Sequence, residues 1–148
     1  MSAEENKAVI RRLFDEVYNG QNFDVLDELV AENVVNHSAT AEHKYGIEGF
    51  RHVMEWGCAL MPDGRYELLD MIAEGEMVAC RVRVSGTMQG ELFGIPPTGK
   101  SATVEHVHWH RLAGGKLVER WAVRDDLGAL IQLGIIDAPG HFQADNPE

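Results

Sequence analysis

The chain has 148 residues, of which 45% are hydrophobic and 25% are charged, and this balance predicts one domain over residues 1–148 with an irregular tail after about residue 138. Its formal charge of −11 repels phosphate groups, so we expect it to bind neither nucleic acid nor an anionic membrane. The first twelve residues are acidic at the start and lack an apolar run, and no stretch reaches the ~18 apolar residues of a membrane span, so we expect a cytoplasmic protein.

The first third of the chain has the periodicity of helices. Ser2 and Glu5 form an S-x-x-E capping box, and apolar residues then recur at helical spacing as far as Tyr18, before Asn19-Gly20. A second, shorter helix is expected over residues 23–30, followed by a short strand over 33–37. A third helix is expected over 47–61 and ends at the breaker Pro62-Asp63-Gly64.

After this breaker the hydrophobic period changes from 3.6 to 2. We expect strands over residues 66–73, 77–88, 101–112 and 116–123, with a turn at Gly114-Gly115, and a closing helix over 126–133. Helices followed by an antiparallel meander predict an α+β fold. A curved antiparallel sheet wrapped around the N-terminal helices leaves a cone, whose open mouth suits a small apolar ligand.

The most unusual segment is VEHVHWH, residues 104–110. Side chains alternate between the two faces of a strand, so His106, His108 and His110 share one face. Three interpretations compete for this row. It could be a metal site completed by His37 or Asp125, a polar pocket wall that hydrogen-bonds or protonates a carbonyl ligand, or a set of structural histidines. We favour the pocket wall for His106 and His108, and expect no metal; for His110 the structural role is at least as good.

Other candidate residues are weaker. Asn36 and His37 end the early strand, where they could line the cone mouth or simply hydrogen-bond local backbone. Asp125 and Asp126 precede the last helix, so one of them should cap it while the other could face inward. Phe50, Met54 and Trp56 could contact a flat ligand, although a helical stripe is commonly core. Trp121 is a further candidate ligand contact. Cys58 and Cys80 are expected to be buried free thiols.

Three motifs give the chain a resemblance to a known family. GELFGIPPTG at 90–99, GKLVERW at 115–121 and DDLGALIQLG at 125–134 resemble the signatures of SnoaL-like polyketide (ester) cyclases, over about residues 4–136. The resemblance implies the cone of the nuclear-transport-factor-2-like superfamily and a homodimer or homotetramer. It also implies chemistry without cofactor or metal, in which an aspartate removes a proton next to a carbonyl and polar groups hold the enolate oxygen.

The family's site residues match this chain unevenly. His108 matches the pocket histidine, His106 stands where glutamine is common, and Asn36 matches the pocket asparagine. The catalytic aspartate should directly follow Trp121, but residue 122 is alanine, and losing a general base typically costs on the order of 10²–10⁴ in rate.

Three functions follow from these residues. The first is an acid/base enzyme, a cyclase or a related cofactor-free hydroxylase, that acts on a polyketide-like or aromatic ketone. In it His108 or His106 would be the acid or base, Asn36 would hold the carbonyl, and Asp125 would orient a histidine. The second is a small-molecule binding cone without turnover, which Ala122 favours. The third is a metal-dependent enzyme built on the histidine row.

Overall fold

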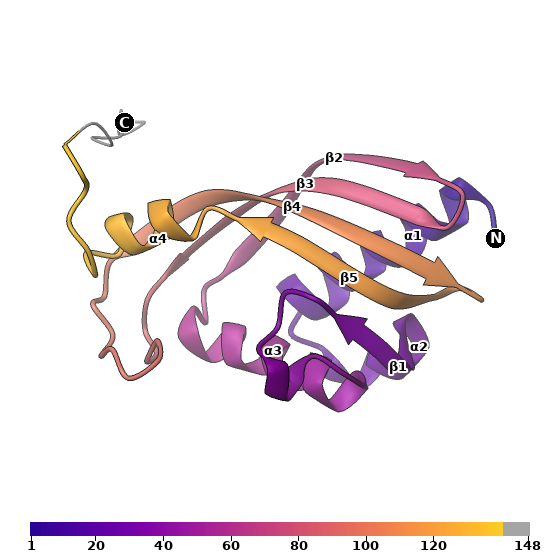
Figure 1. Cartoon of the computed structure of the whole chain (residues 1–148), viewed down its shortest axis with the longest axis horizontal. Helices are drawn as coiled ribbons and strands as arrows, with labels where there is room; N and C mark the ends of the chain where they lie inside the picture. The colour runs from indigo at the N-terminus through magenta and orange to yellow at the C-terminus, as the bar shows by residue number, and fades with distance from the viewer. Residues whose placement is uncertain (141–148) are drawn as a thin grey trace.

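The computed structural model describes residues 1–140, and the expected irregular tail lies largely outside this range. Helices precede a single five-stranded sheet, and a short helix closes the chain (Figure 1). The elements in chain order are α1 (Ala3–Arg12), a π-helix (Leu13–Asn19), a 3₁₀ helix (Phe23–Val25), α2 (Leu26–Leu29), β1 (Val30–Asn36), a 3₁₀ helix (Ala41–His43), α3 (Ile47–Leu60), β2 (Arg65–Glu74), β3 (Met77–Thr87), β4 (Ser101–Ala113), β5 (Lys116–Arg124) and α4 (Asp126–Gln132).

The first helix begins where the sequence predicts it. The Ser2 hydroxyl accepts a hydrogen bond from the Glu5 amide while the Glu5 carboxylate accepts one from the Ser2 amide, so the expected capping box is present. From Leu13 the helix continues in the wider π form. Phe14 and Tyr18 face inward from this part and stack with ring centroids 4.6 Å apart.

The sheet differs from the expected four-stranded meander in one strand. Strands β2 to β5 are consecutive antiparallel neighbours, but β1 joins the edge of β5 in parallel, giving the order β1-β5-β4-β3-β2. Val30, expected on the second helix, instead begins β1 and pairs with Leu117, because Val30, Val34 and Val35 favour extended backbone. The α+β class and the curved sheet over N-terminal helices are confirmed, and the sheet is mixed rather than antiparallel throughout.

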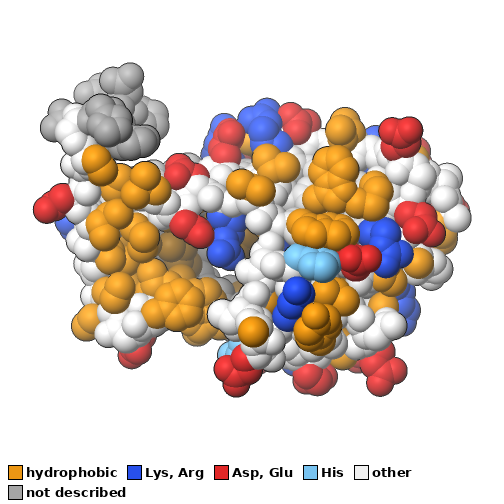
Figure 2. All heavy atoms as spheres, viewed as in Figure 1, with side chains coloured by type: hydrophobic (Ala, Val, Ile, Leu, Met, Phe, Trp, Pro, Cys, Tyr) orange, Lys and Arg blue, Asp and Glu red, His pale blue; other side chains and the backbone are white. Residues whose placement is uncertain are grey.

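The core lies between the concave face of the sheet and the helices. Its largest fully buried apolar side chains include Phe14 and Phe50, from the π-helix and α3, against Val78 and Val82 of β3. A second, smaller cluster joins Met88, Ala102 and Leu133 near α4. Figure 2 shows the surface hollowed between the part of the molecule that carries α4 and the main body, with hydrophobic side chains around the hollow.

Within the described residues, no helix combines the length and hydrophobicity needed to cross a membrane. Cys58 and Cys80 are both free, Cys80 buried and Cys58 half-buried.

Candidate functional site

Strand β4 places the three histidines on the concave face, as their alternation predicts. Each is paired in register with an inward-facing residue of β3: His106 with Val82, His108 with Cys80 and His110 with Val78. His108 and His110 are fully buried, whereas His106 is half-buried and closer to the α4 end of the sheet. The row therefore runs from the closed core toward the open side of the cone.

The donor and the acceptor can be assigned in each hydrogen bond along this row. The Arg120 guanidinium can only donate, so the His108 Nδ1 atom 3.3 Å from it must accept, and the proton of His108 is on Nε2. This Nε2 lies 3.4 Å from His106 Nδ1 and donates to it, so the proton of His106 is also on Nε2. His106 Nε2–H is thus the free end of the relay, and it is not among the buried unpaired atoms of the described residues.

All three imidazoles are neutral near pH 7. Burial, with a smaller effect of Arg124 and Arg120, lowers the pKa of His106 to about 4. Burial and then the positive charge of Arg120 lower the pKa of His108 well below its usual value, and the same two causes lower that of His110 to about 3. These side chains act as hydrogen-bonding groups, and their low pKa values make them weak bases.

His110 has a structural role. Its Nδ1 lies 3.2 Å from the Val78 carbonyl oxygen, to which it must donate, and its ring meets Phe14 edge-on. It ends the row inside the core, away from the accessible end at His106.

Arg120 is a site residue that the sequence reasoning missed. It is only 5% exposed, and it donates to the Asn36 Oδ1 atom over 3.0 Å as well as to His108. A simple two-residue hairpin at Gly114-Gly115 would pair His110 with Glu119 and turn Arg120 outward. A bulge between Arg111 and Leu112 shifts the register, so that His110 pairs with Arg120 and the guanidinium enters the cone.

The guanidinium has no acidic partner. None of the ion pairs among the described residues involves Arg120. Four side-chain atoms around it are buried and unpaired within residues 1–140: three that can donate, which are its own Nε, the Asn36 Nδ2 and the Tyr18 hydroxyl, and the acceptor His110 Nε2. Burial raises the pKa of Tyr18, although the neighbouring Arg120 acts to lower it, so this hydroxyl stays protonated. The cluster is rich in donors and carries one uncompensated positive charge.

The side chains of Asn36 and Asp125 are hydrogen-bonded within the protein. The Asn36 side chain holds Arg120 and also accepts from the Ser38 amide over 3.2 Å, so its oxygen is already used within the protein. Asp125 caps α4 by accepting from the Gly128 amide over 2.9 Å, as one of the two aspartates was expected to do.

The structure separates His37 and Trp121 from the histidine row. Trp121 alternates with Arg120 and lies on the outer face of the sheet, paired with Trp109. His37 stacks on it with centroids 4.6 Å apart and lies 2.9 Å from a Glu119 carboxylate oxygen. These residues cannot contact a ligand that binds at His106.

The α3 stripe is divided between core and rim. Phe50 and Met54 belong to the buried core, as is common for an apolar stripe along a helix. Trp56 is half-buried and packs near Phe93, which is 80% exposed on the loop between β3 and β4, with ring centroids 5.5 Å apart. Of the three, only Trp56 is open to a ligand.

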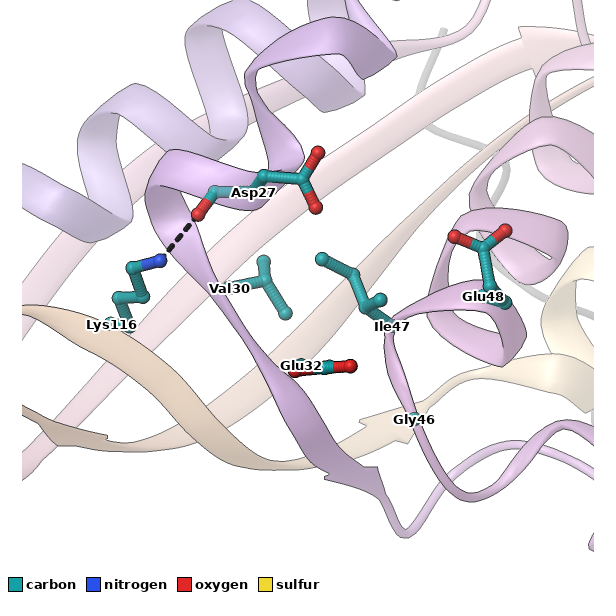
Figure 3. Close-up of a pocket in the computed structure, with 7 residues that line it drawn as sticks. All are labelled: Asp27, Val30, Glu32, Gly46, Ile47, Glu48 and Lys116. Atoms are coloured by element: carbon teal, nitrogen blue, oxygen red, sulfur yellow. Dashed lines mark hydrogen bonds between the residues drawn. The ribbon is translucent and has the colours of Figure 1, made fainter.

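Two further features bear on the choice of site. Across residues 1–140, no three His, Cys, Asp or Glu side chains gather in an arrangement that could hold a metal ion. A surface pocket at the β1 edge is lined by acidic and apolar side chains, and the Lys116 ammonium donates to the Asp27 carbonyl oxygen beside it (Figure 3). In that view the carboxylates of Asp27 and Glu48 lie apart, on α2 and α3 respectively.

Comparison with known proteins identifies the family and the fold. The family model described as SnoaL-like polyketide cyclase matches residues 8–133. The nogalonic acid methyl ester cyclase of Streptomyces nogalater is 30% identical over 120 residues, covering 79% of this chain and 89% of that protein. Wild-type IdmH from Streptomyces antibioticus is 31% identical with a TM-score of 0.74, over 87% of this chain and 98% of that one. TsrD from Streptomyces laurentii shares the fold at 23% identity with a TM-score of 0.84, over 92% of this chain and 99% of that structure.

Proposed function

The chain belongs to the SnoaL-like polyketide cyclase family, and we propose that it catalyses a cofactor-free aldol cyclisation, or a related reaction through an enolate, on a polyketide-like aromatic ketone. The observation that carries this proposal is the directed relay from Arg120 through His108 to His106. Its free end is a neutral N–H donor at the accessible end of a buried row, which is the arrangement that stabilises an oxygen gaining negative charge.

The reaction needs few protein groups besides this donor. A proton leaves the carbon next to the substrate ketone, and the enolate oxygen accepts a hydrogen bond from His106 Nε2–H. The enolate carbon then attacks a second carbonyl carbon of the same molecule, and the new alkoxide takes up a proton. The charge of Arg120 behind His108 favours the anionic enolate over the neutral ketone, because electrostatic interactions are strong away from water.

Ala122 explains why this chain differs from an aspartate-bearing cyclase. It lies opposite His108 on the inner face of β5, at the position where the family resemblance places the catalytic base. A methyl group accepts no proton, so we propose that solvent water at the open side accepts it. Turnover should then be slower, on the order of 10²–10⁴-fold, than with a positioned carboxylate.

Solvent deuterium exchange tests the proposal. Nogalonic acid and its methyl ester are incubated with the protein in D₂O, and mass spectrometry follows both deuterium uptake and ring closure. His106→Leu should reduce exchange by roughly 10²–10³, the usual cost of one oxyanion donor, while His106→Gln keeps an N–H donor and should retain most of it. Exchange that is absent in the parent, or unchanged in His106→Leu, contradicts the proposed reaction.

A binding cone without turnover is the second candidate, and Ala122 is the observation that favours it. In that case the parent shows no exchange, whereas Ala122→Asp, which restores a carboxylate opposite His108, gains it. The ligand class would be the same, a small aromatic or polyketide-like molecule.

We also propose that two copies associate through the outer face of the sheet, forming a homodimer. Apolar side chains of neighbouring strands adjoin there: Trp109 pairs with Trp121 and Val107 with Val123, and these four side chains are exposed or half-buried. Beside them Arg81 bonds both Asp70 and Glu105 over 3.0 Å, so that charges are largely paired within the face. A locally neutral, apolar face suits contact with a second copy of itself.

A further inference from the structure

The charge inside the cone points to the chemical class of the ligand. Arg120 is 95% removed from solvent and has no carboxylate partner among the described residues, although burying an unpaired charge is costly. The three histidines add no compensating charge, because a neutral imidazole carries none. The interior is therefore electropositive within a chain whose total formal charge is −11.

Four side-chain atoms near Arg120 are buried without a hydrogen-bond partner among residues 1–140, and three of them can donate. These three are the Arg120 Nε, the Asn36 amide nitrogen and the Tyr18 hydroxyl, whereas the fourth, His110 Nε2, is an acceptor because the His110 proton is on Nδ1. Buried polar groups are almost always paired in folded proteins, so an acceptor carried by a ligand would satisfy these donors. A carboxylate offers about four acceptor positions, and it matches the fork of a guanidinium.

Ala122 lies next to this cluster on β5. This residue is half-buried and follows Arg120 on the inner face of β5, toward the end of the strand where α4 begins. The half-buried His106 lies on the neighbouring strand at the same end.

We propose that Arg120 binds a carboxylate carried by the ligand, with Asn36 and Tyr18 as additional donors, so that this cone selects an aromatic keto acid over its neutral ester. The inference deepens the proposed function and rests on it for the aromatic ketone part of the ligand. The carboxylate contacts Arg120 directly, whereas the enolate oxygen of the proposed reaction contacts His106.

Two probes that cannot undergo the reaction test this proposal. They are 1-hydroxy-2-naphthoate and its methyl ester, which differ in one negative charge, and their dissociation constants are measured by calorimetry near pH 7. The parent protein should bind the acid at least about tenfold more tightly than the ester, as a charge-assisted hydrogen bond predicts. Arg120→Gln should abolish this preference, and Arg120→Lys, which keeps the charge, should retain part of it.

Substitution of Ala122 gives an independent answer if Arg120→Gln does not fold. Ala122→Asp and Ala122→Asn fill the same volume, but only the aspartate brings a negative charge next to Arg120, so the acid preference should fall further in Ala122→Asp. Equal binding of the two probes, binding of neither, or a preference that survives both Arg120→Gln and Ala122→Asp would overturn the inference. Because the probes do not react, this result is independent of whether deuterium exchange is found in the ketones.

Discussion

Arg120 determines what the neighbouring histidines can do. Because a guanidinium cannot give up its proton, it fixes His108 as an acceptor at Nδ1 and, through it, His106 as an acceptor at the same atom. It also lowers the pKa of both rings, in addition to the larger effect of burial. One residue thus turns two potential bases into a chain of neutral donors, and this favours stabilisation of an oxyanion over removal of a proton.

A single copy of the chain leaves the outer face of the sheet uncovered. Trp109 on β4 is 45% exposed, and Val123 on the neighbouring strand β5 is 75% exposed. In Figure 2, hydrophobic side chains gather over the sheet between charged ones. A same-face contact between two copies would cover them.

Replacing one tryptophan tests this interface. Trp109→Glu places a charge in the apolar row, so it should convert a dimer into a monomer of half the mass. Leu127→Glu, which changes an exposed apolar side chain on α4, is the matched control and should leave the dimer intact. Light scattering coupled to size-exclusion chromatography measures both masses. A parent protein that is already monomeric, or a dimer that persists in Trp109→Glu, contradicts the interface.

The elements and the histidine face could be predicted from the sequence, because both depend on local periodicity. Alternation in residues 104–110 was sufficient to place His106 and His108 on the face that turns inward. The register of β5 could not be predicted in this way, since the bulge beside Arg111 depends on packing across the hairpin. Arg120 was therefore missed, and Trp121 was expected to contact the ligand although it faces outward.

The parallel position of β1 also depends on long-range contacts. The Ser38 hydroxyl accepts from the Ala122 amide over 2.7 Å, and the His37 amide donates to the Arg120 carbonyl oxygen, which ties the end of β1 to β5. Separations of more than 80 residues leave no local signal for such pairing. The same contacts bring Asn36 to Arg120, and therefore help to form the site.

At the scale of the whole molecule, the buried histidines make folding sensitive to acid. Their pKa values are lower in the folded protein than the usual 6.5 of a free side chain, so between about pH 6.5 and pH 4 the unfolded chain binds protons that the folded protein does not. The free energy of unfolding should therefore fall as the pH falls through this range. The stability that the neutral buried histidines contribute should be fully retained only above the pKa of the unfolded side chains.

Urea unfolding between about pH 7 and pH 5 measures this effect. Each fully buried histidine contributes a slope of up to about 1.4 kcal/mol per pH unit, so His110→Gln should make the slope shallower by about that amount. His52→Gln changes an exposed histidine and should leave the slope unchanged. If His110→Gln shows the same pH dependence as the parent, His110 is not held neutral by burial.

The proposed relay depends on which nitrogen of each imidazole carries the proton, and long-range ¹H–¹⁵N correlation spectra of the ¹⁵N-histidine-labelled protein measure this directly. At about pH 7 we predict neutral rings throughout the row, with the proton on Nε2 in His106 and His108 and on Nδ1 in His110. A positively charged ring at His106 or His108, or a proton on Nδ1 of His108, would contradict the relay from Arg120 and the donor role of His106.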